Sequence, residues 1–69
     1  MKNSVKVERA KKNITQADLA KEIQVSRQTI NAIEQGSYNL STVLALKISA
    51  YFETPVNEIF ELEESDWKK

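Results

Sequence analysis

The 69-residue sequence contains no cysteine and no histidine, and it has a single glycine, a single proline and no long apolar run. The missing side chains exclude disulfides, thiolate and imidazole metal ligands, and the Ser/His/Asp and Cys/His arrangements of nucleophilic catalysis. Carboxylate catalysis would need an enclosing pocket, which so short a chain can barely build. We therefore expect a protein that is not an enzyme and that has no cofactor, no metal and no small-molecule ligand.

Membrane and export signals are also missing. No apolar stretch approaches the roughly 18 residues that a membrane-spanning helix needs. The N-terminal stretch MKNSVKVERAKK lacks the apolar segment of a signal peptide. One glycine and one proline leave no flexible linker or low-complexity segment. The sequence thus predicts a cytoplasmic protein without a membrane partner, with one domain over residues 1–69 and its core in residues 4–60.

The formal net charge of zero conceals two oppositely charged segments. Residues 1–52 carry eight basic and four acidic side chains, whereas residues 53–69 carry six acidic and two basic ones. Binding responds to the local potential and not to the sum, so a basic body with an acidic end suits a polyanionic partner on one surface.

Helix start and stop signals recur at short intervals, and the apolar spacing between them is three and four, which predicts an all-α fold. We expect five helices, which end or begin near Lys12, Thr15, Gly36, Ser41 and Pro55. The expected inward positions are Val7, Ala10 and Ile14 for the first helix, Leu19, Ala20 and Ile23 for the second, Ile30 and Ile33 for the third, Leu44, Ile48, Tyr51 and Phe52 for the fourth, and Val56, Ile59 and Phe60 for the fifth.

The second and third helices are separated by Gln24, Val25 and Ser26 alone. Two short helices joined by such a turn must cross steeply, which is the helix-turn-helix corner. Ser26 is a good cap for the third helix, and Gly36 is placed to end it in a left-handed conformation.

The outer face of the third helix is rich in amides and nearly free of acids, as a helix entering the major groove requires. Arg27 can bond guanine O6 and N7, and Gln28 and Asn31 can pair with adenine N6 and N7. Thr29 offers a methyl group or a hydroxyl. We expect these four side chains to contact the bases of double-stranded DNA.

The runs ITQADLA (14–20), VSRQTI (25–30) and IEQG (33–36) resemble the two-helix motif of the phage repressor and Cro type of regulator, also called the XRE family. The resemblance spans about residues 5–60 and is greatest to small stand-alone members such as the cytolysin-repressor type. It implies a compact five-helix, lambda-repressor-like DNA-binding domain in which helices two and three form the helix-turn-helix. It also implies a transcriptional repressor that acts as a homodimer.

Two groups of polar residues suit phosphate binding. Gln16 opens the second helix, whose N-terminal N–H groups favour anions, and the family uses a glutamine here as a backbone clamp. Ser26 has the equivalent place on the third helix, although capping alone would account for it. Ser37, Tyr38 and Asn39 look like a second set of phosphate contacts.

The resemblance further implies a partly buried ion pair between Arg9 and Glu34, which holds the third helix in place. The sequence departs from the family at Gln24, where glycine is usual. Either the turn accepts a left-handed glutamine, or its shape differs.

Val56, Ile59, Phe60 and Leu62 expose more apolar area than a short fifth helix can bury, which predicts a homodimer interface. A small helical core also gains support from dimerisation. A two-fold dimer would place two recognition helices roughly 34 Å apart and so predicts a palindromic operator. The cytolysin-repressor resemblance implies instead that residues 60–64 pair with residues 1–4 as a two-stranded β-ribbon, so residues 61–69 are expected to be an acidic tail or a short strand.

A second function stays open at this point: an antitoxin or another protein-interaction module, whose main partner is a protein held through the acidic tail. DNA binding should weaken steeply with salt and lose its site preference in Arg27→Ala. A protein partner would copurify, and its binding would survive Arg27→Ala but not truncation after Phe60.

Overall fold

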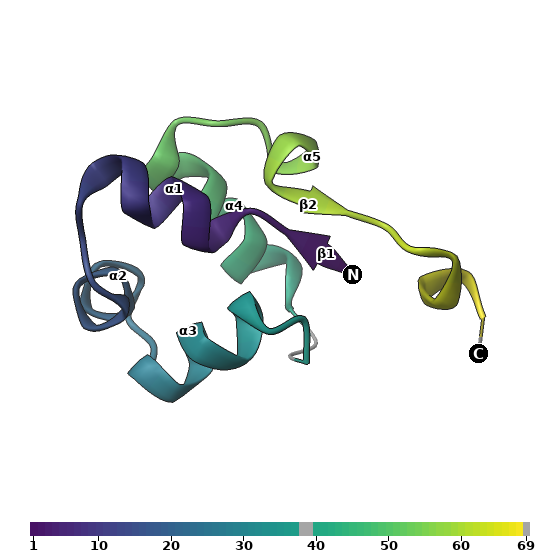
Figure 1. Ribbon diagram of the computed structural model, residues 1–69, viewed down its shortest axis with the longest axis horizontal. Helices are drawn as coiled ribbons and strands as arrows, with labels where there is room; N and C mark the ends of the chain where they lie inside the picture. The colour runs from purple at the N-terminus through teal and green to yellow at the C-terminus, as the bar shows by residue number, and fades with distance from the viewer. Residues whose placement is uncertain (38–39, 69) are drawn as a thin grey trace.

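The computed structural model describes residues 1–37 and 40–68 as five α-helices with a two-stranded antiparallel sheet (Figure 1). In chain order the elements are β1 (Lys2–Asn3), α1 (Val5–Lys12), α2 (Gln16–Ile23), α3 (Arg27–Glu34), α4 (Thr42–Phe52), α5 (Val56–Ile59), β2 (Phe60–Glu61) and a 3₁₀ helix, η1 (Glu64–Trp67). The sheet pairs Lys2 with Glu61 and Asn3 with Phe60. The predicted five-helix fold, with its terminal ribbon, is confirmed.

Three helices begin at the hydroxyl residues that the sequence indicated. The Thr15 hydroxyl accepts from the Asp18 N–H, and the Asp18 carboxylate accepts from the Thr15 N–H, both at 3.0 Å. Ser26 and Ser41 each accept a backbone N–H at 3.1 Å from the first turn of α3 and of α4. A cap of this kind stabilises a helix by about 1 kcal/mol. These caps set where α2, α3 and α4 start.

The first and last α-helices begin without a hydrogen bond from the side chain of the cap residue. The cap position of α1 is Ser4, but the bond to the first turn comes from Asn3, whose Oδ1 accepts from the Val5 N–H at 3.1 Å. Pro55 has an extended ψ of 140° and stands directly before α5, which begins at Val56.

A single apolar core lies between the helices, and every α-helix contributes to it. The buried apolar residues are Val5, Leu19, Ala20, Ile23, Ile30, Ile33, Leu44, Ile48, Phe52, Ile59 and Phe60. The inward positions predicted for α2 and α3 are confirmed, as are those of α4 apart from Tyr51, which is half-buried with its ring edge-on to Phe52. Among residues 1–37 and 40–68, no helix is long and apolar enough to cross a membrane.

Of the apolar stripe predicted for α1, Ile14 is half-buried against the core, but the other two positions are wrong. Val7 is 53% exposed and Ala10 is exposed, whereas Val5 is fully buried. Val5 and Arg9 are four residues apart and therefore share a helix face, which points away from Val7. This face meets the rest of the protein, so a charged side chain takes the place where an apolar one was expected.

Two left-handed residues shape the chain around α3. Gln24 ends α2 with φ 63° and ψ 48°, so the turn accepts a left-handed glutamine. Gly36 follows α3 with φ 76°, as predicted, and a Cβ there would stand 3.3 Å from the backbone oxygen of Met1.

Candidate nucleic-acid interface

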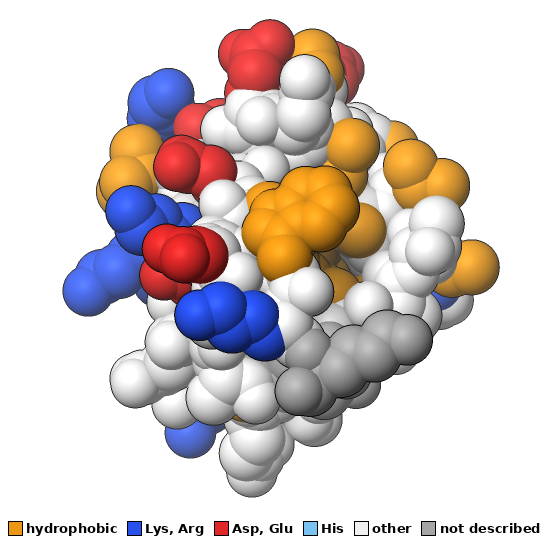
Figure 2. Space-filling view, turned by 90° about the vertical axis from the view of Figure 1, so that its right-hand side faces the viewer, with side chains coloured by type: hydrophobic (Ala, Val, Ile, Leu, Met, Phe, Trp, Pro, Cys, Tyr) orange, Lys and Arg blue, Asp and Glu red, His pale blue; other side chains and the backbone are white. Residues whose placement is uncertain are grey.

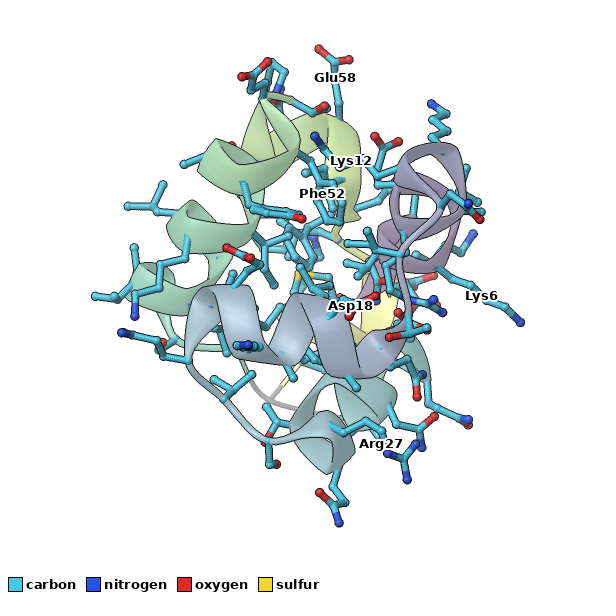
Figure 3. All side chains as sticks on the ribbon, turned by 90° about the vertical axis from the view of Figure 1, so that its left-hand side faces the viewer. Lys6, Lys12, Asp18, Arg27, Phe52 and Glu58 are labelled. Atoms are coloured by element: carbon cyan, nitrogen blue, oxygen red, sulfur yellow. The ribbon has the colours of Figure 1, made fainter. Side chains whose placement is uncertain are left out.

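The short connection from Gln24 to Ser26 joins α2 to α3 and leaves one face of α3 open. Ile30 and Ile33 are buried in the core, and Val25 packs against it at the corner. On the opposite face Arg27, Gln28 and Asn31 are exposed. Figure 3 shows Arg27 near the lower edge of the molecule, on the outside of α3. Helix α3 therefore presents a polar side to the outside on a rigid support.

Thr29 differs from the other three predicted base contacts. It is half-buried, and its hydroxyl lies 2.9 Å from the Ser26 hydroxyl, next to the capping bond. Ser26 therefore has a structural role at the start of α3, and Thr29 shares in it. The part of the Thr29 side chain that remains available for contact with a ligand is chiefly its methyl group.

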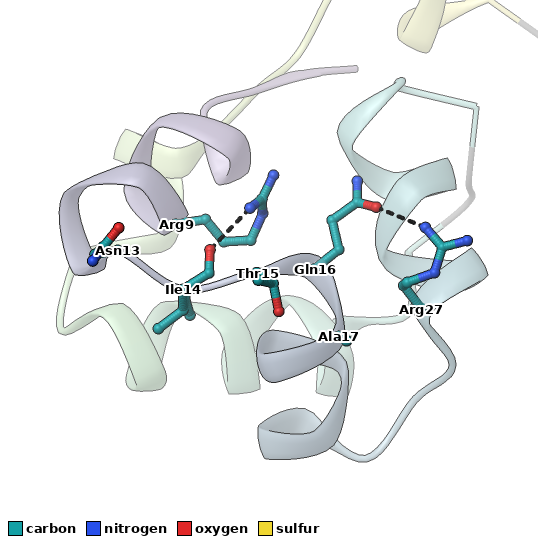
Figure 4. A pocket seen from close by; sticks show the side chains of 7 residues that line it. All are labelled: Arg9, Asn13, Ile14, Thr15, Gln16, Ala17 and Arg27. Carbon is teal, nitrogen blue, oxygen red and sulfur yellow. Dashed lines mark hydrogen bonds between the residues drawn. The ribbon is translucent and has the colours of Figure 1, made fainter.

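The side chain of Gln16 links α2 to α3. Its Nε2 donates to Glu34 Oε1 at 3.1 Å and to Asn31 Oδ1 at 3.2 Å. Its Oε1 accepts from Arg27 Nη1 at 3.2 Å, the bond drawn between the two side chains in Figure 4. One amide thus holds two exposed side chains of α3 and one shielded carboxylate.

The carboxylate of Glu34 is also held by Arg9 from α1. Arg9 Nε donates to Glu34 Oε2 at 2.6 Å, and Nη2 donates to Oε1 at 3.1 Å. A third guanidinium N–H, on Nη1, donates to the backbone oxygen of Ile14 at 3.0 Å. Arg9 therefore ties α1, the start of α2 and the end of α3 together.

The charges of this cluster favour an ionised Glu34. Burial opposes its ionisation, but the hydrogen bonds from Arg9 and Gln16, with the positive charges of Arg9 and Lys6, outweigh burial and hold the pKa of Glu34 below its ordinary value of 4.5. Its hydrogen bond with Glu34 raises the pKa of Arg9, despite some burial. Both groups are charged near neutral pH, so the network contains a permanent carboxylate.

A shallow cavity of about 480 Å³ opens beside the N-terminus of α2 (Figure 4). Its lining residues are Arg9, Asn13, Ile14, Thr15, Gln16, Ala17 and Arg27. Two guanidinium groups at the N-terminal end of α2 suit an anion here. In the part of the chain that the structure describes, no three His, Cys, Asp or Glu side chains are grouped to hold a metal ion.

The remaining predicted phosphate contacts lie between α3 and α4. Ser37 is exposed, and its hydroxyl donates to the backbone oxygen of Ala32 at 3.2 Å. Tyr38 and Asn39 lie outside the described residues.

The residues predicted for a dimer interface differ in exposure. Ile59 and Phe60 are largely buried in the protomer's own core, because α5 packs against α4 and β2 packs against α5. Val56 is half-buried, and Leu62 is exposed.

Further exposed apolar residues, on α4, were missed from the sequence. Val43 and Leu46 are exposed on α4, three residues apart, beside the buried stripe of the same helix. A helix with apolar residues on two faces can bury one of them in its own core and leaves the other exposed. The apolar residues on both faces of α4 are the sequence signal that could have indicated this surface. The groove here, about 230 Å³, is lined by Met1, Leu40, Ser41, Thr42, Ala45, Leu46, Val56 and Phe60, and we call it the α4 groove.

Known proteins have sequences similar to this one over nearly its whole length. A family model described as Helix-turn-helix matches residues 5–59. An uncharacterized HTH-type transcriptional regulator of Methanocaldococcus jannaschii is 50% identical over 66 residues, which cover 96% of this chain and 100% of the relative. Regulators described in the same words occur in Archaeoglobus fulgidus, at 43% identity over 100% of this chain and 99% of the relative, and in Bacillus subtilis, at 44% over 96% and 100%. The chain belongs to the XRE-type family of helix-turn-helix transcriptional regulators and is a DNA-binding regulator.

Proposed function

We propose that the protein is a repressor that binds a palindromic operator as a homodimer and inserts α3 into the major groove. The observation that carries this proposal is the exposed polar face of α3, where Arg27, Gln28 and Asn31 stand on a helix held by the Arg9–Glu34 pair. A bound dimer would cover its operator and keep other proteins from the same groove, which is the simplest way for so small a domain to repress.

Base recognition is assigned to Arg27, Gln28 and Asn31, with the Thr29 methyl group as an apolar contact. Arginine and the amides carry the N–H groups and carbonyls that match base edges, and each good two-pronged pair discriminates by about 1–3 kcal/mol. The three polar side chains lie in the first turns of α3, the part of a recognition helix that reaches bases in this motif.

Phosphate contacts would flank the recognition helix. Gln16 and the cavity at the start of α2 suit one phosphate, with Arg27 at its edge. The exposed hydroxyls of Ser26 and Ser37 suit others. Tyr38 and Asn39 stay sequence-based predictions of the same contact. Such contacts position the protein on the duplex without reading its sequence.

The surface for a second copy is the α4 groove and its rim. Val43, Leu62 and Trp67 are further exposed apolar side chains. Figure 2 shows apolar side chains gathered on one side of the molecule. Figure 2 is seen from the right-hand side of Figure 1. In Figure 1, α3 lies along the lower edge of the molecule. A two-fold axis that runs vertically in Figure 1, at the right-hand side of the molecule, would keep the two copies of α3 on the same lower face of the dimer. A two-fold operator requires this arrangement.

Selection of bound sequences from random duplex DNA at two salt concentrations tests this function. We expect a palindromic consensus, and an affinity that falls by roughly 0.9 log units per log unit of salt for each phosphate neutralised. Arg27→Ala should remove the preference at one base pair of each half-site. Lys47→Ala is the matched control, since it removes an exposed charge from α4 and not from α3.

Two results would reject the proposal. A consensus without two-fold symmetry would exclude the homodimer on DNA. The second result is the absence of any sequence preference, together with a protein that copurifies and binds Arg27→Ala but not a chain truncated after Phe60. This result would favour the protein-interaction module instead.

A further inference from the structure

The phosphate contacts assigned so far supply little positive charge. Gln16, Ser26 and Ser37 are neutral, so they can donate hydrogen bonds to a phosphate but cannot replace its counterions. Arg27 is assigned to a base, and the guanidinium of Arg9 is engaged by a carboxylate. A surface that binds DNA gains affinity by releasing counterions, which requires cations beside the recognition helix.

A second hollow, of about 440 Å³, lies between α1 and α3, on the side where Asn31 is exposed. It is lined by Lys6, Arg9, Gln16, Asn31, Glu34 and Gln35, and we call it the α1–α3 hollow. Arg9 and Gln16 also line the cavity at the start of α2, so the two openings adjoin each other. The α1–α3 hollow is therefore next to the polar face of α3.

Among the described residues, Lys6 is the lysine that lines the α1–α3 hollow. Its side chain is exposed, and within residues 1–37 and 40–68 it forms no ion pair. Figure 3 shows Lys6 on the outside of α1, on the same right-hand side of the view as Arg27. Lys11 lies on the same helix, but it pairs with Glu8 at 3.2 Å and does not line the hollow.

The carboxylate of Glu34 does not cancel the charge of Lys6. Both carboxylate oxygens are already held, by Arg9 and Gln16, and the Glu34 side chain is only 6% exposed. The positive charge of Arg9 balances the negative charge of Glu34. The hollow therefore has an excess of positive charge, and Lys6 carries it on the exposed side.

We propose that Lys6 binds a phosphate of the DNA backbone at the mouth of the α1–α3 hollow. This inference rests on the proposed function, in which α3 enters the major groove. The two sugar-phosphate backbones border that groove, so a duplex whose bases meet Asn31 brings phosphates to the elements beside α3. Lysine suits such a contact, because its ammonium is a point charge on a flexible stem and needs no fixed geometry.

The first test is the salt dependence of operator binding by wild type, Lys6→Gln and Lys11→Gln. Each phosphate neutralised contributes about 0.9 to the slope of log affinity against log salt. With one such contact in each half-site, the slope of Lys6→Gln should be shallower by about 1.8, and raising the salt from about 50 to 200 mM should weaken this variant about 12-fold less than wild type. Lys11→Gln makes the same charge change on the same helix and should keep the wild-type slope.

Three readouts distinguish a phosphate contact from other roles of Lys6. Lys6→Arg keeps the positive charge and should restore the slope. The relative affinities for operators with substituted base pairs should be the same in Lys6→Gln and wild type, because phosphate contacts carry no sequence information. The melting temperature of Lys6→Gln should match that of wild type, since Lys6 is exposed and glutamine is about as good a helix former as lysine.

A neutral backbone locates the contact. Replacing each operator phosphate in turn by a methylphosphonate removes one negative charge at a known position. Wild type should lose affinity at one phosphate of each half-site where Lys6→Gln loses nothing further. Lys11→Gln should be as sensitive as wild type at that same phosphate.

Three outcomes would overturn the inference while leaving a sequence-specific regulator. They are a slope that Lys6→Gln leaves unchanged or that Lys6→Arg does not restore, a base preference that changes in Lys6→Gln, and the lack of any phosphate at which Lys6→Gln alone is insensitive. A wild-type protein without any base preference would reject the proposed function itself, so the two failures are distinguishable.

Discussion

The guanidinium of Arg9 and the carboxylate of Glu34 bind each other through two hydrogen bonds, at 2.6 and 3.1 Å, across the gap between α1 and α3. Their side chains are only 15% and 6% exposed. Removing either partner would leave a charge in a site that water reaches poorly, and an unpaired charge of this kind is expensive. The pair therefore fixes α3 relative to the rest of the bundle.

Arg9→Ala should lower the free energy of unfolding by about 3–5 kcal/mol, the usual cost of breaking a shielded ion pair. Urea unfolding followed by circular dichroism measures it. Lys11→Ala is the control on the same helix: Lys11 is 67% exposed and pairs with Glu8 in solvent, so its loss should cost less than about 1 kcal/mol. Equal stability of the two variants would show that the Arg9 pair does not hold the fold.

The same pair should make stability depend on acid. The pKa of Glu34 lies below 4.5 in the folded protein, so its contribution is complete above that pH and disappears as the pH falls through the folded value. We expect the stability difference between wild type and Glu34→Gln to be constant from pH 7 to about 5 and to shrink below about 4.5. Other carboxylates are common to both proteins and cancel. A difference that stays constant down to pH 3 would contradict the shift.

Much of the fold could be predicted because its determinants are local. Thr15, Ser26 and Ser41 begin helices through bonds to residues three positions away, which the sequence displays directly. The stripe of α1 could not be predicted from apolar spacing alone, because Val7 and Val5 are equally apolar, and the face that turns inward is the one that carries Val5 and Arg9.

For the candidate site, residue types could be predicted but their partners could not. Arg27 and Asn31 were identified by chemistry and place on the helix, whereas their shared link to Gln16 joins residues 11 and 15 positions apart. The burial of Ile59 and Phe60 in the protomer's own core could not be predicted for a related reason. An apolar residue looks alike in sequence whether it faces its own core or a partner, and here β2 turns Phe60 inward.

Gln24 allows a prediction about the corner itself. Its left-handed backbone costs a residue with a Cβ about 1 kcal/mol or more, which glycine avoids. Glycine also makes the unfolded chain more flexible, which offsets part of the gain. Gln24→Gly should therefore stabilise the protein by up to about 1 kcal/mol in thermal unfolding.

Two control variants separate the relief of backbone strain at position 24 from the general effect of introducing a glycine. Gln24→Ala keeps the Cβ and should give no gain. Glu22→Gly places the same new residue inside α2, where it should cost about 1 kcal/mol. Destabilisation by Gln24→Gly would mean that the glutamine side chain contributes more to the turn than its backbone strain removes.

Leu46→Glu tests the α4 groove as the surface for a second copy. Leu46 is 54% exposed, so a charge there should leave the protomer folded. In a dimer the charge would be buried against an apolar surface, and two leucine contacts would be lost. Since 1.4 kcal/mol is tenfold, the dimer dissociation constant should rise at least about tenfold in sedimentation equilibrium, and operator binding should weaken with it. Val7→Glu is a matched control, because Val7 is 53% exposed on α1 and does not line the groove. If both variants dimerise like wild type, the two copies meet at another surface. If wild type binds a palindromic operator only as independent monomers, the α4 groove is not a dimer interface.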